Sequence, residues 1–347
     1  MEITMDQKFL SSSWPNLQFV PESFVHPPEK RPGKLLFART CKTIPVVDLE
    51  AHDQTQIIQH IMKATQEFGF FQAINHGVSK KLIDDAMGVF KQFHAMPTKD
   101  KASQRSKDPK RSCKFYTSSQ NYSAEEVHYW RDALTHPCYP LEECMQFWPE
   151  KPFRYRKVIG EYVIELRKFG EKILEMLCEG LGLSRSYLSG GLSGNPELMV
   201  NHYPPCPDPS LTLGLANHKD PSLITILLQE ENGLQVFNDG EWIGVEPLPH
   251  SFVVNVGYVL QIISNGKLKG AEHRAVTNSS FARTSAAFLI YPSNDSLIEP
   301  AKALTNACYP PLYRAMQFKE FQRNFLCRGA NAELVLQFIS SQQSYST

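Results

Sequence analysis

Residues 236–242 read VFNDGEW, and their Asn-Asp-Gly separates two β-like runs, LQVFN (234–238) and EWIGVE (241–246). Asn and Asp next to Gly, placed between such runs, are strong signals for a tight β-hairpin. The stretch therefore predicts a hairpin inside a β-rich part of the chain.

The same texture continues on both sides of this hairpin, from Pro196 onward. Turn residues separate six further runs rich in β-branched and aromatic residues: ELMVNHY (197–203), LITILLQ (223–229), SFVVNV (251–256), LQIIS (260–264), HRAVTN (273–278) and RTSAAFLIY (283–291). Eight short runs of this kind suit a double-sheet jelly roll. We therefore expect a mainly β fold with flanking helices, its jelly-roll core in residues 196–300.

The residues before this core favour helices. Apolar side chains recur at helical spacing from Gln54 to Phe68, in LIDDAMGVFKQFHAM (82–96) and over a long amphipathic stretch from about 153 to 182. IPVVDL (44–49) and FFQAIN (70–75) are the strand-like exceptions. This half of the chain is predicted to be a helix-rich region, 44–195, that packs on the barrel.

The remaining segments have less periodicity. Residues 1–43, with scattered prolines, read as an arm over the surface. Residues 98–125 are polar and charged, which indicates a mobile loop with one brief aromatic element at KFYTSS (114–119). Residues 301–347 are expected to form a C-terminal helical segment and tail.

Composition points to a small-molecule partner. The 36 basic and 36 acidic residues cancel, so no excess of charge favours nucleic acid or an anionic membrane. The eight cysteines lack any Cys-x-x-Cys pair, and no signal-peptide core or membrane-length apolar run is present. We expect reduced thiols, a cytoplasmic location and, because no heptad or apolar helix face is left unexplained, a monomer.

The stretch LANHKDPS (215–222) places His218 and Asp220 two residues apart. On a strand these side chains project to the same side, where they could meet a metal, a substrate or solvent. The next histidine on a strand-like run is His273, in GAEHRAV. Two imidazoles and one carboxylate make a facial triad for Fe(II), which leaves positions open for other ligands, whereas a structural zinc site is closed by four.

A second pattern follows ten residues after His273. In FARTSAAFLIY, Arg283 and Ser285 share one strand face by the period of two. A guanidinium beside a hydroxyl is a natural clamp for a carboxylate. A co-substrate that chelates iron at one end and presents a carboxylate at the other would satisfy both patterns, and 2-oxoglutarate has that shape.

These motifs resemble those of the plant 2-oxoglutarate- and Fe(II)-dependent dioxygenases. The resemblance is carried by NHYPPCPDPSLTLGLANHKDPSLITILLQ (201–229), GLQVFNDGEWIGVEPLPHSFVVNVG (233–257), SNGKLKGAEHRAVTNS (264–279), ARTSAAF (282–288) and FGFFQAINHGV (68–78). Within the family, YWRDALTHPCYPLEE (129–143) and WPEKP (148–152) look most similar to the hyoscyamine 6β-hydroxylase and mugineic-acid dioxygenase branch.

The resemblance implies a distorted double-stranded β-helix that uses Fe(II), 2-oxoglutarate and O2, with ascorbate as reductant. It makes His218, Asp220 and His273 the iron ligands. Arg283 and Ser285 would hold the distal carboxylate of 2-oxoglutarate, and the co-substrate would also meet Tyr203 as a donor, with Asn201 nearby. The implied reaction is hydroxylation, or alternatively desaturation or epoxidation, of a small specialised metabolite such as an alkaloid.

The substrate would lie beyond the co-substrate. Extending the two strand faces adds Met199, Leu289 and Tyr291, and three aromatic residues of the front loop could close over the site: Phe115, Tyr116 and Tyr122. Two other functions use the same residues. One is a zinc hydrolase that activates water on the triad. The other is a catalytically silent family member that binds a small molecule as a sensor.

Overall fold

The computed structural model describes residues 17–32, 43–50, 53–101, 104, 112–120, 122–328 and 332–340. The rest of the predicted N-terminal arm and of the 98–125 loop lies outside the described residues. Within the described part of the arm, two short 3-10 turns occur, η2 (Glu22–Phe24) and η3 (Pro28–Lys30). Phe24 is buried there against Trp130, so this part of the arm is packed onto the body of the protein.

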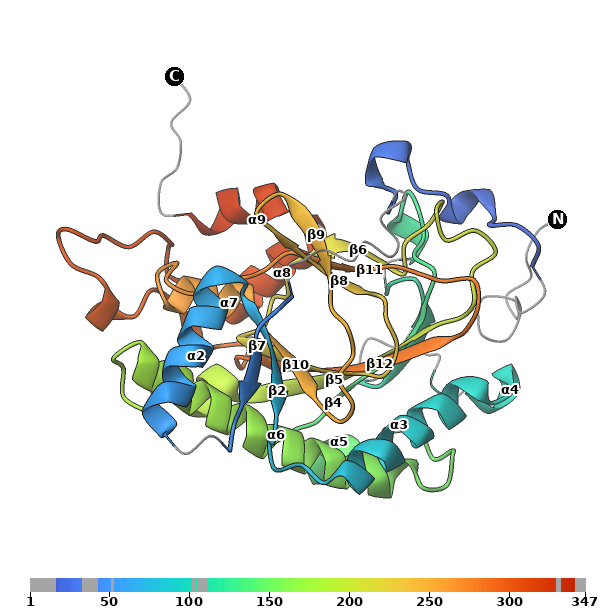
Figure 1. The fold of residues 1–347 in the computed structure, drawn as a ribbon, viewed down its shortest axis with the longest axis horizontal. Helices are drawn as coiled ribbons and strands as arrows, with labels where there is room; N and C mark the ends of the chain where they lie inside the picture. The colour runs from blue at the N-terminus through green and yellow to red at the C-terminus, as the bar shows by residue number, and fades with distance from the viewer. Residues whose placement is uncertain are drawn as a thin grey trace.

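Two β-sheets face each other and form the core (Figure 1). In order, the larger sheet contains β1 (Val46–Asp48), β2 (Phe70–Ile74), β10 (Phe252–Val256), β7 (Ile224–Gln229), β12 (Arg283–Tyr291), β5 (Asn195–Tyr203), β4 (Asp132–Pro137) and β3 (Lys114–Thr117). The smaller sheet contains β6 (Leu215–His218), β11 (His273–Ala275), β8 (Leu234–Asn238) and β9 (Glu241–Gly244). The expected jelly-roll core is therefore confirmed.

The hairpin predicted at residues 236–242 joins β8 to β9. Asn238 pairs with Glu241, and the two residues between them, Asp239 and Gly240, have φ angles of 50° and 84°. Positive φ at both central positions is the requirement of a type I′ turn, which matches the twist of the flanking strands.

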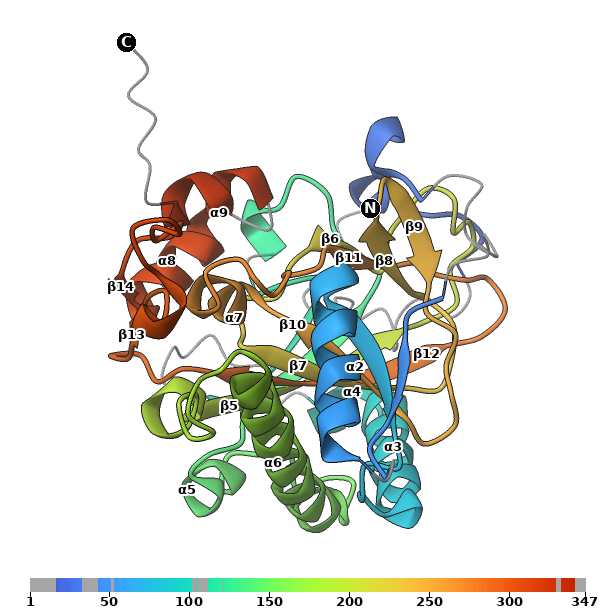
Figure 2. The same cartoon turned by 60° about the vertical axis from the view of Figure 1, so that its left-hand side comes forward.

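Helices pack against the larger sheet and stand at one end of the core (Figures 1 and 2). The helices before the core are α2 (Gln54–Glu67), α3 (Lys80–Ala95), α4 (Thr98–Lys101), α5 (Leu141–Met145) and α6 (Tyr155–Gly180). Later in the chain come α7 (Tyr258–Ile263), α8 (Phe318–Arg328) and α9 (Ala332–Ile339), the last two in the predicted C-terminal helical segment. None of the helices in the described part of the chain is long and apolar enough to cross a membrane.

The outer face of the larger sheet is the face against which helix α6 packs. A Cβ on Gly170 of this helix would lie 2.4 Å from Ile290 Cδ1 and 3.3 Å from Ile226 Cδ1, so helix and sheet are in close contact. Since strand side chains alternate, the neighbours Leu289 and Thr225 project from the opposite face, which we call the inner face. Leu289 is paired with Thr225, and with Glu197 on the other side.

Two features differ from the predictions. LQIIS (260–264) was expected as a strand but belongs to α7, because a short, fully buried apolar run does not distinguish strand from helix by periodicity. A Cβ on Gly257, just before α7, would lie 2.1 Å from the Ser222 carbonyl oxygen, so only glycine allows this approach.

The second difference is the strand β4, which was not predicted. It pairs with β5 across the proposed boundary at residue 196.

Candidate active site

His218, Asp220 and His273 converge between the sheets. One potential ligand atom from each residue lies within 4.8 Å of those from the other two. Among the described residues, these three side chains are placed so that together they could hold a metal ion. His218 Nε2 is 3.4 Å and His273 Nε2 is 3.6 Å from Asp220 Oδ1. The histidines are register partners on β6 and β11, whereas Asp220 follows the end of β6. The predicted triad is thus assembled by a strand pair and the loop that leaves it.

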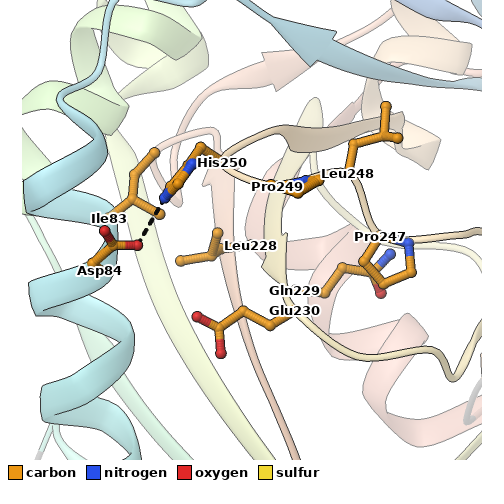
Figure 3. A pocket seen from close by; sticks show the side chains of 9 residues that line it. All are labelled: Ile83, Asp84, Leu228, Gln229, Glu230, Pro247, Leu248, Pro249 and His250. Carbon is orange, nitrogen blue, oxygen red and sulfur yellow. Dashed lines mark hydrogen bonds and ion pairs between the residues drawn. The ribbon is translucent and has the colours of Figure 1, made fainter.

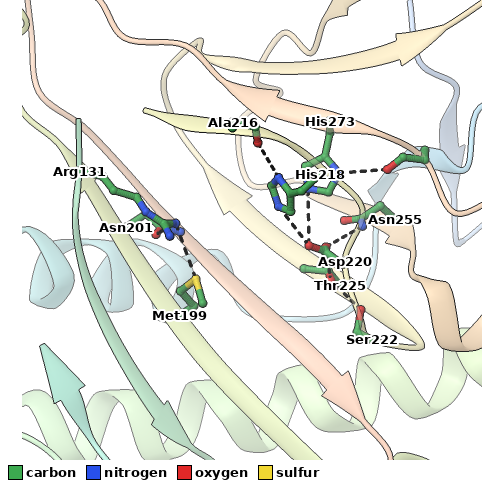
Figure 4. Close-up of polar contacts among 11 residues, drawn as sticks. Arg131, Met199, Asn201, Ala216, His218, Asp220, Ser222, Thr225, Asn255 and His273 are labelled. Atoms are coloured by element: carbon green, nitrogen blue, oxygen red, sulfur yellow. Dashed lines mark hydrogen bonds and ion pairs between the residues drawn. The ribbon is translucent and has the colours of Figure 1, made fainter. Parts of the chain in front are cut away.

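Backbone carbonyls fix the orientation of both imidazoles (Figure 4). Nδ1 of His218 lies 2.9 Å from the Ala216 oxygen, and Nδ1 of His273 lies 3.1 Å from the Ala271 oxygen. Because a carbonyl only accepts, Nδ1 carries the proton and the Nε2 lone pair of each ring faces Asp220. This arrangement prepares an imidazole to bind a metal.

The carboxylate of Asp220 is held from the opposite side. Its Oδ2 accepts hydrogen bonds from Thr225 Oγ1 at 2.6 Å and Asn255 Nδ2 at 2.8 Å, on β7 and β10 (Figure 4). Oδ1 is left toward the two histidines. Thr225 and Asn255 were not identified from the sequence, although a polar residue inside an apolar strand is the signal that could have drawn attention to each.

The electrostatics suit a divalent cation. Burial would raise the pKa of Asp220, but the two histidines and the Asn255 amide outweigh it and hold this pKa well below its usual range. Burial, together with the neighbouring His218, lowers the pKa of His273 to about 4. The cluster therefore offers an ionised oxygen and a neutral imidazole nitrogen at neutral pH, as a metal site requires. Two imidazoles and one carboxylate fit Fe(II) with open coordination positions.

Arg283 provides a second site on the inner face. Its side chain is 2% exposed; Nη2 donates to Gln229 Oε1 at 2.9 Å and Nε to the Glu231 oxygen at 3.2 Å. Nη1 is buried and has no hydrogen-bond partner among the described residues. Ser285 lies two residues further on β12 and is also buried. A buried donor without a partner is costly, so this pair fits a carboxylate.

Tyr203 and Asn201 lie opposite this pair on β5. In the strand register Tyr203 faces Arg283 and Asn201 faces Ser285, and the Arg283 guanidinium lies 5.0 Å from the centre of the Tyr203 ring. The structure therefore brings together the four residues that the sequence placed around the co-substrate carboxylate.

Comparisons with known proteins agree with this geometry. The model of the 2OG-Fe(II) oxygenase superfamily matches residues 194–292, and that of the non-haem dioxygenase N-terminal region, described from morphine synthesis, matches residues 44–151. Hyoscyamine 6-dioxygenase from Hyoscyamus niger is 41% identical, over 91% of this chain and 94% of its own length. The chain belongs to the 2-oxoglutarate- and Fe(II)-dependent dioxygenases.

Other similar proteins support the same assignment. 2'-Deoxymugineic-acid 2'-dioxygenase from Hordeum vulgare is 41% identical over 88% of this chain and 89% of its own length. The crystal structure of JOX2 in complex with 2OG, Fe and JA superposes with a TM-score of 0.85 at 34% identity and covers 94% of this chain and 95% of that one. The predicted family, branch and cofactors are thereby confirmed, and this protein is a 2-oxoglutarate-dependent enzyme.

Four residues predicted to line the substrate region of the dioxygenase lie on or beside the inner face. Met199 follows the β5 alternation of Asn201 and Tyr203, and Leu289 and Tyr291 follow that of Arg283 on β12. Tyr116 lies on the face of β3 opposite to that of its buried neighbour Phe115. Tyr291 also packs on Phe318 of α8, with ring centres 5.8 Å apart.

The other two aromatic residues of the front loop lie elsewhere. Phe115 packs into the hydrophobic core, with its ring 5.3 Å from that of Phe93 on α3, so its predicted place over the site is wrong. The strand register turns it outward, which the sequence of a single short run does not reveal. Tyr122, in the 3-10 turn η6 (Tyr122–Ala124), stacks on His128, with ring centres 3.7 Å apart. His128 in turn packs edge-on against Phe24 of the N-terminal arm.

A separate pocket lies between α3 and the end of β7 (Figure 3). It is bounded by α3 and by residues 228–230 and 247–250, and Asp84 forms a 2.9 Å ion pair with His250 at its rim. It contains none of the residues predicted for iron, co-substrate or substrate. We assign it no function in the reaction.

Proposed function

We propose that this dioxygenase hydroxylates, or alternatively desaturates or epoxidises, a small specialised metabolite, an alkaloid being the first candidate. His218, Asp220 and His273 would hold Fe(II). Arg283 and Ser285 would bind the distal carboxylate of 2-oxoglutarate, with help from Tyr203 and Asn201. The observation that carries this assignment is the buried Nη1 of Arg283, which lacks a partner among the described residues and lies near the Ser285 hydroxyl. Both residues are on the inner face of the larger sheet. Thr225, on the same face, bonds the proposed iron ligand Asp220.

When bound, Fe(II) and 2-oxoglutarate would activate O2, which is the oxidant: one oxygen atom is taken up as 2-oxoglutarate is converted to succinate and carbon dioxide, and the other oxidises a C–H bond of the substrate. The chain's own residues orient and enclose the reactants. Backbone bonds to Nδ1 fix the histidine rings, and Thr225 and Asn255 fix the carboxylate of Asp220. Apolar residues such as Leu289 would exclude water from the reacting carbon.

The choice of substrate rests on the relatives. Two similar proteins are named for oxidation of hyoscyamine and of 2'-deoxymugineic acid, and a third, from Oryza sativa subsp. japonica, is flavanone 3-dioxygenase 2, 39% identical over 92% of this chain. They share a small organic substrate and differ in its skeleton. A small metabolite is therefore the supported class, and the alkaloid is the more specific hypothesis.

Two other functions make different predictions. A zinc hydrolase would leave Arg283 and Ser285 without a role, since an activated water needs no carboxylate clamp. A silent sensor would keep the binding residues and form no product. Nη1 of Arg283, which has no partner among the described residues and lies beside buried Ser285, favours the dioxygenase over the hydrolase, and only product formation separates the dioxygenase from the sensor.

The three functions separate in one assay. Purified protein is incubated with Fe(II), ascorbate, 2-oxoglutarate and a pooled plant metabolite extract, and succinate is measured; the same assay is run with Zn(II) in place of Fe(II). An oxygenase forms succinate that rises with the extract, needs Fe(II) and disappears in His218→Ala. Hydrolysis with Zn(II) that ignores 2-oxoglutarate would support the hydrolase, and binding of extract compounds without succinate would support the sensor.

A further inference from the structure

Arg131, the residue before β4, carries a buried guanidinium beside the inner face. It is 5% exposed; Nε donates to the Ser118 oxygen at 2.9 Å and Nη1 to Asn201 Oδ1 at 2.8 Å. Nη1 also lies 4.0 Å from Met199 Sδ. Figure 4 shows the side chain extending over Asn201 and Met199, on the side of the sheet where the His218 and Asp220 side chains lie. The guanidinium is therefore directed at the region where the substrate is expected.

Its position is fixed by the residues around it. The preceding residue, Trp130, is fully buried, donates from Nε1 to the Pro204 oxygen at 3.1 Å and from its backbone N–H to the Leu213 oxygen at 2.9 Å. Together with the bonds to Ser118 and Asn201, these contacts hold the Arg131 side chain in one direction. Little conformational entropy would remain to be lost when a ligand binds.

No carboxylate of the described residues forms an ion pair with this guanidinium. In the part of the chain that the structure describes, no ion pair includes Arg131, and its Nη2 makes no hydrogen bond. The nearby acids have other contacts: Asp132 accepts from Thr117 Oγ1 at 2.5 Å, Glu125 lies 2.8 Å from His128 Nδ1, and Glu197, on the same face of β5 as Asn201, interacts electrostatically with Lys114. Nη2 is not among the fully buried atoms without a partner, so it is open to solvent, and an anionic ligand that displaced this solvent would pair with it.

The Arg131 site is distinct from the co-substrate clamp. Nη2 and Nε of Arg283 donate to Gln229 Oε1 and to the Glu231 carbonyl oxygen, and its guanidinium faces Tyr203. The guanidinium of Arg131 reaches β5 further along the strand, at Asn201 and Met199, so the two sites are neighbours that meet at Asn201. The inner face thus has two buried guanidinium groups, and 2-oxoglutarate has only one distal carboxylate to offer. The second group is left for the other reactant.

We propose that Arg131 binds a carboxylate of the organic substrate, so that the enzyme acts on small organic acids. The inference rests on the proposed function and narrows its substrate class from metabolites in general to those that carry a carboxylate, so an alkaloid would qualify only if it also carries one. A guanidinium with a free Nη2 offers a directional, charge-assisted hydrogen bond that a neutral or cationic substrate would leave unmet.

The test is affinity selection under anaerobic conditions, which prevent turnover. Protein loaded with Fe(II) and 2-oxoglutarate is mixed with a plant metabolite extract, separated from free compounds by rapid gel filtration, and the retained compounds are identified by mass spectrometry. A second portion of extract is methylated first, which converts carboxylates to esters. We expect wild-type protein to retain carboxylic acids from the untreated extract and not the corresponding esters.

Variants then assign the effect to the residue. Arg131→Gln should bind the retained acid about 10- to 100-fold more weakly, the equivalent of one lost hydrogen bond to a charged group. Its retention of 2-oxoglutarate should fall much less, because Arg283 and Ser285 are unchanged and, among the co-substrate residues, only Asn201 loses a hydrogen bond. Arg156→Gln is the matched control, because Arg156 also donates to main-chain carbonyls, of Trp148 and Gln146, but lies outside the core. Arg131→Lys keeps the charge without the fork, and should give intermediate binding.

The outcomes are separable. Retention of neutral or cationic compounds only, of no acid at all, or of the acid equally by Arg131→Gln would overturn the inference while leaving the proposed function intact. Failure of wild-type protein to retain 2-oxoglutarate would contradict the proposed function, and the inference with it. The comparison of acid and ester on wild-type protein decides the question even if Arg131→Gln does not fold.

Discussion

Thr225 donates a hydrogen bond of 2.6 Å to Oδ2 of Asp220, and this bond determines which carboxylate oxygen faces the histidines. Asn255 reaches the same oxygen at 2.8 Å from the neighbouring strand. Asp220 follows the end of β6, where no strand ladder holds it, so the larger sheet provides the rigidity that the loop lacks. The metal centre is therefore built from both sheets.

Replacing Thr225 with valine removes this bond and keeps the shape of the side chain. We expect Fe(II) affinity to fall about 10- to 100-fold, as is typical when a group that orients a metal ligand is lost. Thr284→Val is the control, since Thr284 is equally buried and bonds to His202 Nδ1 at 3.0 Å, on the other face of the sheet. Equal Fe(II) affinities for the two variants, measured by anaerobic titration, would refute the role of Thr225.

Arg283→Lys tests the carboxylate clamp. Lysine keeps the positive charge but loses the planar fork, so the bond from the position of Nη1 is no longer available. We expect the KM for 2-oxoglutarate to rise about 10- to 100-fold while Fe(II) affinity stays unchanged. A variant with normal KM for 2-oxoglutarate would remove Arg283 from the proposed site.

Gly214 leaves room for Tyr203, the residue opposite Arg283. A Cβ at Gly214 would lie 2.5 Å from Tyr203 Cδ1, so Gly214→Ala must displace the ring. We predict a loss of about 1–3 kcal/mol in the free energy of unfolding and a higher KM for 2-oxoglutarate. At Gly244 nothing lies within 4 Å of the added atom, so Gly244→Ala should change neither quantity appreciably. Urea denaturation of both variants makes the comparison; equal stability would contradict the packing argument.

Glu197 gives a pH dependence with a defined sign. Burial raises its pKa to about 7, above its ordinary value of about 4.3. Between these values the folded protein binds more protons than the unfolded chain, so this group makes stability fall as pH rises, until about pH 7. The titratable groups that face it are Lys114, Tyr116, Cys138 and Tyr291.

Glu197→Gln should therefore stabilise the protein at pH 8, by about 1–3 kcal/mol, and have little effect at pH 4.5, a value near the ordinary pKa of glutamate. Denaturation at both pH values measures this. A stabilisation that is the same at the two pH values would show that the change comes from packing and not from ionisation of Glu197.

The sequence predicted the residues whose types and spacing are set by chemistry. His218 and Asp220 in H-x-D spacing, with His273 and the Arg283–Ser285 pair, carried the metal and carboxylate patterns, and the structure brings them together. The alternation of side chains was a sound guide along long strands such as β5 and β12, where two partners fix the register.

What depends on tertiary contacts was not predictable. Arg131 lies in YWRDALTHPCYPLEE (129–143), which contributed only to the resemblance to a branch of the family, and only the fold shows that it is buried and forms no ion pair with the described residues. Phe115 was expected among the front-loop aromatic residues that could close over the site, and the fold packs it into the core instead. Residues 260–263 are helical, which the sequence did not reveal because buried apolar runs carry no clear period. Thr225 and Asn255 were not recognised because their role is to bond Asp220, a contact that only the fold reveals. Asn255 is also far from Asp220 in the sequence.

The most direct test of the central claim is an anaerobic titration of Fe(II)-loaded protein with 2-oxoglutarate, followed by the visible charge-transfer absorption that arises when the keto acid chelates the metal. The account predicts a saturable band in wild-type protein, the same final band at higher 2-oxoglutarate concentration in Arg283→Lys, and no band in His218→Ala. A band of full intensity in His218→Ala, or none in iron-loaded wild-type protein, would contradict the assignment of this site.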